Sequence, residues 1–434
     1  MTLIRFVLVL LLASVLAFAA DAPHPGLADQ VNDIYPKIEQ LYIDLHSHPE
    51  LSMHETRTAA RLADTLRGLG YDVTTAVGGT GVVALLKNGA GPTVMLRTEL
   101  DALPVEEKTG WPFASREHAK DDSGAEVPIM HACGHDVHMA ALVGTATLMV
   151  HDRQAWHGTL VLIGQPSEER ASGAAAMLKD GLFTRFSKPD IAFAMHDGNN
   201  LPAGKVGFTP GFSLTSADSV DIVIYGKGGH GATPQDTVDP IVIAARTVLA
   251  LQTIVSREIN PQDPAIITVG SIHGGTKHNI IPSEVKLQIT VRTTKDDVRK
   301  HLLDGIARIA RAEAEAANAP RPPDVKVIES TPAQYNDPKL VERIAASLRQ
   351  QFGDANVVQG SPGTPSDDFA EFGQAGVPTA MFSLGAADPA KWEEAKKTGN
   401  PLPSNHSPFF APDYNPTLHT AVVAETRVLM DLMK

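Results

Sequence analysis

Short apolar segments of strand length alternate with helical segments along most of this chain of 434 residues. Two helices separated by a turn are expected over residues 29–70, where apolar residues recur at helical spacing. The strands expected after them cover 80–89, 92–100, 158–166 and 190–197, and the helices expected between these strands cover 135–150 and 172–183. Buried strands that alternate with helices predict an α/β fold with a mostly parallel sheet.

The pattern changes near residue 215. The next elements are expected as a strand at 216–228, a helix at 239–256, strands at 265–275 and 284–293, a helix at 295–317 and a strand at 324–330. The order β-α-β-β-α-β is that of a ferredoxin-like unit. A strand at 378–385 and a helix at 417–433 then resume the first pattern. We therefore predict a smaller domain, residues 215–329, inserted into a larger domain formed by residues 21–214 and 330–434.

Residues 1–20 are predicted to be a signal peptide. Arg5 precedes an unbroken apolar run, and Ala17-Phe18-Ala19 gives the pattern of small residues that precedes cleavage, near Ala19 or Ala20. A retained membrane anchor is the alternative, but the run is short for a bilayer span of ~20 residues. No later stretch is expected to be apolar enough to span a membrane. These features predict export to the periplasm or the medium.

The net charge of −13 argues against binding to nucleic acid or to an anionic membrane surface, since no basic stripe is present. Cys133 is the single cysteine, so no disulfide can form within the chain. Three interpretations of this thiol remain: a buried core residue, a nucleophile or a metal ligand. Its neighbours His131, His135, Asp136 and His138 make a purely apolar surrounding awkward, because buried polar groups need partners.

Several polar clusters follow directly on expected strands. Asp101 follows the strand at 92–100, Glu168 and Glu169 follow the strand at 158–166, and His196 stands near the end of the strand at 190–197. Ligands of open α/β sheets bind at the carboxyl ends of the strands. An adjacent acidic pair is more often a solvated helix start. The alternative is that one carboxylate binds a metal ion while the other serves as general base.

The sequence resembles the M20 metallopeptidase family, and within it the amidohydrolase branch of aminoacylase-like enzymes, hippurate hydrolases and auxin–amino acid conjugate hydrolases. The motifs that carry the resemblance occur in order from about residue 30 to the C-terminus. They are HPELS (48–52), DALP (101–104), HACGHDVHMA (131–140), QPSEE (165–169), GKGGHGATP (226–234), GGTKHNIIP (274–282) and NHSPFF (405–410).

The resemblance implies a catalytic domain with two divalent metal ions per chain and an inserted ferredoxin-like lid that mediates homodimer formation. The implied metal ligands are Cys133, His135, Glu169, His196 and His406, with the sulfur of Cys133 bridging both ions. Glu168 is implied as the general base and Asp101 as the residue that orients a ligand. His230 and Asn279 on the lid are implied as contacts of the substrate carboxylate or the oxyanion, with His230 acting across a dimer interface. Zinc suits this donor set, and manganese, cobalt and nickel are the alternatives.

The implied reaction is hydrolysis of the amide bond of an N-acyl amino acid. A metallo-carboxypeptidase or dipeptidase, a cysteine hydrolase that uses Cys133 as nucleophile, and a non-catalytic metal-binding relative are the other hypotheses. The chain departs from the family pattern at Glu99, where an aspartate is usual, and at Arg170, where glycines are usual. A role for Glu99 beside the ligands is therefore in doubt, and Arg170 could meet an anionic part of the substrate.

Overall fold

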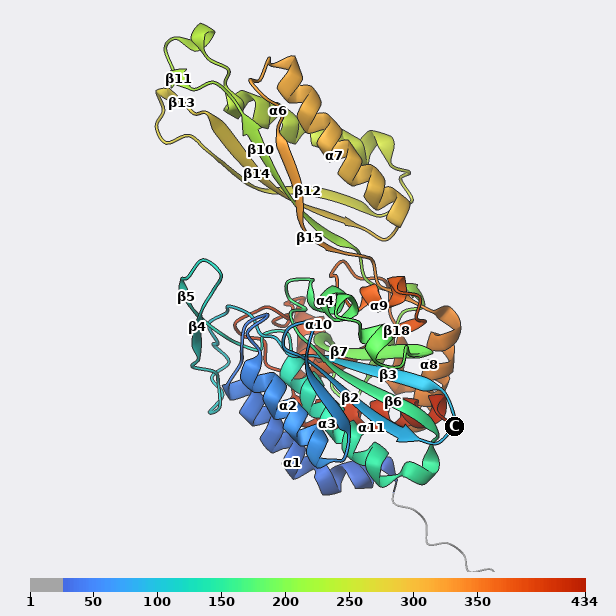
Figure 1. The fold of residues 1–434 in the computed structure, drawn as a ribbon. Helices are drawn as coiled ribbons and strands as arrows, with labels where there is room; N and C mark the ends of the chain where they lie inside the picture. The colour runs from blue at the N-terminus through green and yellow to red at the C-terminus, as the bar shows by residue number, and fades with distance from the viewer. Residues whose placement is uncertain (1–25) are drawn as a thin grey trace, which may run out of the picture.

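The computed structural model describes residues 26–434 and contains two separate main sheets (Figure 1). The predicted signal peptide lies outside the described residues. The strands of the large sheet, in their order across it, are β1 (Asp72–Val77), β2 (Gly81–Asn88), β6 (Gly158–Gln165), β3 (Thr93–Glu99), β7 (Ile191–Pro202), β18 (Thr379–Ala387), β8 (Val206–Phe208) and β17 (Val357–Gln359). The central strands β6, β3, β7 and β18 are parallel. The pairs β1–β2, β2–β6 and β18–β8 are antiparallel, and the edge strand β17 pairs with β8 in parallel. The α/β fold is confirmed, with a mixed, mostly parallel sheet.

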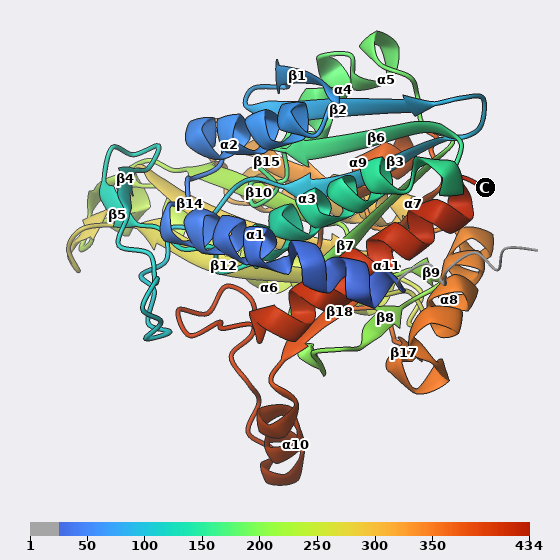
Figure 2. The same cartoon turned by 90° about the horizontal axis from the view of Figure 1, so that it is seen from below.

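Helices cover both faces of the large sheet. One face carries α1 (Leu27–Ser47), α2 (Thr56–Gly68), α3 (His135–His151), α8 (Pro338–Phe352) and α11 (Tyr414–Leu432) (Figure 2). The other face carries α4 (Gly173–Lys179) and α9 (Ala370–Gln374). Helix α3 lies between the sheet and the outer helices α1 and α11, so nearly all of its side chains are buried. Its sequence is accordingly apolar on every side, as expected for a fully enclosed helix.

The second sheet contains β12 (Ala265–Gly274), β14 (Glu284–Thr293), β10 (Ala217–Tyr225) and β15 (Asp324–Thr331), in this order and antiparallel throughout. Helices α6 (Pro240–Thr253) and α7 (Asp296–Ala316) pack on one of its faces (Figure 1). Buried and partly exposed residues alternate along β10, because only one face of the sheet is covered. The exact domain boundaries and the function of this unit as a lid stay predictions.

The remaining elements are short. They are β4 (His118–Lys120), β5 (Glu126–Pro128), η1 (Arg153–Ala155), α5 (Leu182–Arg185), β9 (Gly211–Phe212), β11 (Gly229–His230), η2 (Pro234–Asp236), η3 (Ile254–Glu258), β13 (Ile280–Ile281), β16 (Tyr335–Asn336), η4 (Asp354–Asn356) and α10 (Pro389–Thr398). The helix expected at 172–183 is divided into α4 and α5, because Gly181 between them has a φ of 90°.

The expectation that no later stretch is apolar enough to span a membrane was wrong. Among the described residues, α6 together with η3 (Pro240–Glu258) is long and apolar enough to cross a membrane by length and composition. In the structure its apolar residues Ile243, Leu251 and Ile254 pack in the core of the second sheet. Ile241, Val242 and Leu249, by contrast, are exposed. The helix therefore has one apolar side in the core and a second one on the surface.

Candidate metal centre

The polar clusters that follow strands in the sequence meet at the carboxyl ends of β3 and β6, beside the start of α3. Asp101 follows β3, the Glu168–Glu169 pair follows β6, and His196 lies on β7. His196 was expected near the end of its strand. Pairing with β18 carries β7 on to Pro202, so His196 lies within the strand. Because the strands are parallel, these side chains converge on one edge of the sheet.

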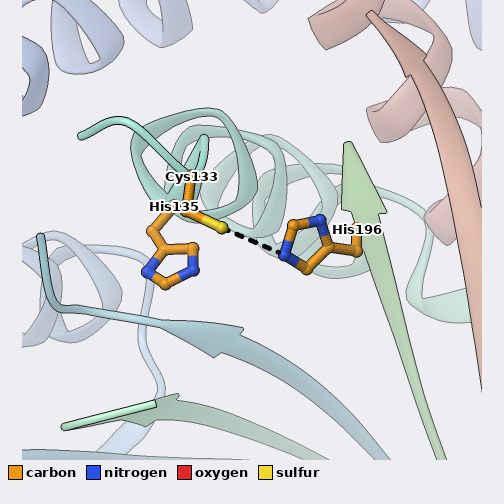
Figure 3. A group of neighbouring side chains, drawn as sticks. All are labelled: Cys133, His135 and His196. Carbon is orange, nitrogen blue, oxygen red and sulfur yellow. Dashed lines mark hydrogen bonds between the residues drawn. The ribbon is translucent and has the colours of Figure 1, made fainter. Parts of the chain in front are cut away.

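Gly134 shapes the segment between the two nearest candidate ligands. Its φ is 84°, a conformation that L side chains rarely adopt, and a Cβ on it would lie 2.0 Å from Asp197 Oδ1. Glycine is therefore required if the chain is to turn into α3 while Asp197 lies against it. The turn brings Cys133 and His135 to the same place at the start of the helix (Figure 3).

Cys133, His135 and His196 form a first group, in which the donor atoms all lie within 4.8 Å of one another. The sulfur of Cys133 points toward His196 and lies 3.6 Å from its Nε2 (Figure 3). The Nδ1 atom of each histidine lies against a backbone carbonyl, 2.7 Å from that of Asp101 for His135 and 2.9 Å from that of Asp197 for His196. Since Nδ1 donates to a carbonyl, Nε2 of each ring is the atom available to a metal ion.

Cys133, Glu169 and His406 form a second group by the same criterion. His406 Nε2 lies 3.4 Å from Glu169 Oε2. His406 has a φ of 69°, which is uncommon for a residue other than glycine, and its backbone N donates to the carbonyl of Ala132. Asn405 Nδ2 also donates to the carbonyl of Cys133 at 3.1 Å. The loop before α11 is thus fastened to the cysteine segment, and Cys133 belongs to both groups.

Asp101 contacts residues of both groups. Its Oδ2 accepts hydrogen bonds from Ser52 Oγ at 2.6 Å and from the backbone N of Glu169 at 3.0 Å. Its carbonyl accepts from His135 Nδ1, as described above. Asp101 therefore orients one imidazole and holds the backbone of the Glu169 segment.

A buried network that the sequence did not predict lies behind the two groups. His138 lies between two carboxylates, with Nδ1 2.9 Å from Glu99 Oε2 and Nε2 3.1 Å from Asp197 Oδ1. Burial would lower the pKa of His138, but Glu99 and Asp197 outweigh burial and raise it to about 10. The structure thus gives Glu99 a defined place beside the ligands. The sequence feature that could have indicated this network is the position of His138, one helical turn after His135.

Arg97 continues this network on the other side of Glu99. It is fully buried and pairs with Glu99, with Asp367 at 2.8 Å and with Asp368 at 3.3 Å. Because both nitrogens of His138 and the carboxylate of Glu99 already have charged partners, we consider these side chains supports of the site and not ligands.

Burial and neighbouring carboxylates raise the pKa values of three acidic side chains in the site. Burial, followed by repulsion from Asp367 and Glu169, raises the pKa of Glu168 well above its ordinary value. Burial raises the pKa of Glu169 to about 7, although His135 opposes the shift. Burial and the two neighbouring glutamates raise the pKa of the Cys133 thiol. A bound cation would stabilise all three deprotonated forms.

The donor atoms fit divalent metal ions. His135 Nε2 and Glu169 Oε1 are buried and have no hydrogen-bond partner within the described chain. Buried polar atoms normally have partners, and sulfur, imidazole and carboxylate together suit zinc and related cations.

Comparison with known proteins agrees with this geometry. Residues 95–397 match the family model described as Peptidase family M20/M25/M40. The chain belongs to peptidase family M20. It is therefore a hydrolase of the amidohydrolase and peptidase type that the M20 relatives represent.

Three M20 relatives illustrate the range of proteins to which this chain is similar. Thermostable carboxypeptidase 1 of Saccharolobus solfataricus is 35% identical over 392 residues, which are 89% of this chain and 93% of the relative. Hippurate hydrolase of Campylobacter jejuni is 34% identical over 354 residues, 80% of this chain and 88% of the relative. The crystal structure of the YXEP protein of Bacillus subtilis, described as a dinuclear metal binding peptidase from the M20 family, has a TM-score of 0.73 and 28% identity, and the match covers 93% of this chain and 100% of that one.

A cavity of about 970 Å³ is lined by four of the five candidate ligands of this M20 chain, Cys133, Glu169, His196 and His406. Its walls come from three parts of the molecule: the site itself, the second sheet through Ser219 and Arg292, and helix α10 with the loop that follows it. Glu168 also lines the cavity, beside the two ligand groups; its Oε2 lies 3.8 Å from His135 Nε2.

His230 and Asn279 do not join the other predicted site residues. Among the described residues, neither of them lines the cavity. They lie next to each other at β11 and β13, at the end of the second domain that is far from the large sheet (Figure 1). Within one M20 chain of this shape they therefore do not reach the candidate metal centre.

Proposed function

We propose that the protein hydrolyses the amide bond of N-acyl amino acids, with Glu168 as general base. The observation that carries the proposal is that Cys133 belongs to two ligand groups while Glu168, which belongs to neither, lines the same cavity. The activities for which two relatives are named, a hippurate hydrolase and an N-acetyl-L-cysteine deacetylase, support the substrate class.

One divalent cation would be held by Cys133, His135 and His196, and a second by Cys133, Glu169 and His406. When bound, they would polarise the substrate carbonyl and lower the pKa of a water molecule toward ~7. The carboxylate of Glu168 would accept the proton of this water and deliver it to the leaving amine nitrogen. Asp101 keeps His135 and Glu169 in position throughout. The donor set favours zinc; manganese, cobalt and nickel are the alternatives.

Dimer formation through the second domain is part of the proposal. Its support is a set of exposed apolar side chains on α6 and on the edge strand β12: Ile241, Val242, Leu249, Ile266 and Ile272. Exposed apolar groups of this kind favour a protein partner. A second copy would also bring His230 and Asn279 toward a site that they do not reach in their own chain. Export from the cytoplasm through residues 1–20 is likewise proposed.

A metallo-carboxypeptidase is the second candidate function, favoured by the similarity to thermostable carboxypeptidase 1. The two candidate functions differ in the group that is joined through the amide bond to the released amino acid. In the first it is a simple acyl group, and in the second it is another amino acid or a peptide. A cysteine hydrolase is disfavoured, because the pKa of the Cys133 thiol is raised by burial and by the two glutamates.

The deciding experiment combines elemental analysis with a hydrolysis screen. Purified protein is analysed for metal content and assayed on N-acyl amino acids and on dipeptides, with and without a chelator. About two divalent ions per chain and chelator-sensitive release of amino acid from N-acyl substrates are expected. Hydrolysis that is insensitive to chelator, with no metal bound, would overturn the proposal, and a preference for dipeptides would support the carboxypeptidase alternative.

A further inference from the structure

Helix α10 contributes to the cavity of the candidate metal centre although it belongs to no hydrophobic core. None of its ten described side chains is fully buried, and it stands out from the body of the molecule (Figure 2). Trp392 and Ala395, which are three residues apart and so share one face of the helix, are half-buried and line the cavity. The helix therefore directs its one apolar face at the catalytic cavity.

Local interactions define both ends of this helix. Asp388 caps its start by accepting hydrogen bonds from the backbone N of Ala390 and of Lys391, both at 2.9 Å, and Pro389 occupies the first position. Gly399, with a φ of 75°, ends it. A helix that is built this way without support from a core is not needed for packing, so the place of its tryptophan calls for a functional explanation.

The segment after α10 connects it directly to the candidate ligands. Asn199 Nδ2 donates to the carbonyl of Pro403 at 2.8 Å, and Asn405 Nδ2 donates to the carbonyls of Cys133 and Asp197. Leu402, directly before the first of these anchors, adds an apolar side chain to the cavity wall. The wall that carries Trp392 is thus fixed relative to the ligand groups.

The indole of Trp392 is held in place by its neighbour on the helix. Lys396 Nζ lies 4.3 Å from the centroid of the ring, which is a cation–π contact across one turn. The second sheet adds a different chemistry to the cavity lining, because it contributes the guanidinium of Arg292, which donates to Ser366 Oγ at 2.8 Å. A carboxylate suits the Arg292 wall, whereas a flat apolar group suits the wall made by Trp392, Ala395 and Leu402.

We propose that the Trp392 wall of α10 is the subsite for the acyl group and that it selects aromatic acyl groups, such as benzoyl or phenylacetyl, over acetyl. This inference rests on the proposed function. The substrate would lie across the metal centre with its amino acid carboxylate toward Arg292 and its acyl ring toward the indole.

The test compares two substrates of the same amino acid, one phenylacetylated and one acetylated, in wild type and in Trp392→Ala. Since contacts in apolar pockets contribute about tenfold or more to discrimination, kcat/KM for the phenylacetyl substrate is expected to fall at least tenfold through KM. For the acetyl substrate it is expected to change less than threefold. Trp392→Phe should restore most of the preference. Lys397→Ala, on the same helix but not on the cavity wall, serves as the matched control and should behave as wild type.

Equal losses of kcat/KM on both substrates in Trp392→Ala, or no preference for the aromatic acyl group in wild type, would overturn the proposed subsite. Absence of hydrolysis of either substrate by the metal-loaded wild type would instead contradict the proposed function. A binding measurement further distinguishes failure of the subsite from failure of the proposed function. Phenylacetate, the expected product, should change the tryptophan fluorescence of wild type and of Lys397→Ala. In Trp392→Phe this change should be lost, and an unchanged signal there would also count against the subsite.

Discussion

Glu168 and Glu169 are neighbours in the sequence but have different surroundings. The backbone of Glu169 is held by Asp101, and its side chain lies against His406 and near His135. The side chain of Glu168 lines the cavity, and the carboxylates of Asp367 and Asp368 repel its negative charge. These surroundings favour Glu169 as the metal ligand and Glu168 as the proposed general base.

Glu168→Gln should therefore separate metal binding from catalysis. Glutamine keeps the shape of the side chain but cannot accept the proton, and general bases contribute about 100-fold to 10,000-fold. We expect full metal content by elemental analysis together with a loss of at least about 100-fold in kcat. The exposed Glu126→Gln is the control. Activity near that of the wild type would remove Glu168 from its role.

Cys133→Ser should affect metal binding itself. A serine hydroxyl is a much poorer ligand than a thiolate for zinc-like cations. Because Cys133 belongs to both ligand groups, we expect metal content well below two ions per chain and activity reduced in proportion or further. Two tightly bound ions and full turnover in this variant would show that the sulfur does not bridge the ions.

Glu425 makes the stability of the protein depend on pH. It is buried on α11, where it accepts a hydrogen bond from Thr145 Oγ1 at 2.8 Å, and burial raises its pKa to about 8. Because the folded pKa lies above the unfolded value, its contribution to the free energy of unfolding is fully present below about pH 4.5 and is lost as the pH rises through 8. At about 1.4 kcal/mol per pKa unit, the loss is on the order of a few kcal/mol.

Glu425→Gln should remove most of this dependence, since glutamine can accept the same hydrogen bond without a charge. Denaturant unfolding at pH 5 and pH 8.5 measures the difference for wild type and variant. The exposed Glu315→Gln should retain the slope of the wild type. A variant at residue 425 with an unchanged slope would show that Glu425 does not titrate in this range.

At the scale of the elements, the start of α3 decides whether the ligands meet. Gly134→Ala combines an unfavourable positive φ with a Cβ only 2.0 Å from Asp197 Oδ1. We expect displacement of Cys133 and His135, a loss of metal affinity of at least about tenfold and a loss of stability of roughly 1–3 kcal/mol. Gly204→Ala, where φ is 90° and no atom lies within 4 Å, measures the backbone cost alone. Equal effects of the two substitutions would contradict the structural role of the contact with Asp197.

The elements that carry the site could be predicted, because each combines an apolar run with a polar residue at its end. The network behind the site could not. Arg97 and Asp367 are 270 positions apart, and only the order of strands in the sheet brings them together. Helix α10 was also not predicted, because it is too short and too polar to show an apolar period. Local sequence patterns thus identify the candidate metal ligands. The residues that support these ligands can be identified only from the tertiary structure.

At the scale of the whole molecule, the main feature is the distance between two regions, the candidate metal centre and the pair His230 and Asn279. The cavity lies at the edge of the large sheet, while His230 and Asn279 lie at the far end of the second domain. If both regions act on one substrate, a second copy must supply one of them. The exposed apolar residues of α6 and β12 offer the surface on which two copies would associate.

Mixed dimers provide the corresponding test. Glu168→Gln and His230→Ala should each be inactive or nearly so alone, because the first lacks the base and the second lacks the lid donor. In a co-expressed mixture, a dimer with one chain of each kind has one site in which Glu168 and His230 are both intact, if the histidine comes from the other chain. We expect activity of about a quarter of that of the wild type, since about half of the dimers are mixed and each has one intact site. Light scattering should show a dimer, and Leu249→Glu should dissociate it and abolish the recovery. Activity in the mixture no higher than the mean of the two single variants would place His230 outside the partner's site.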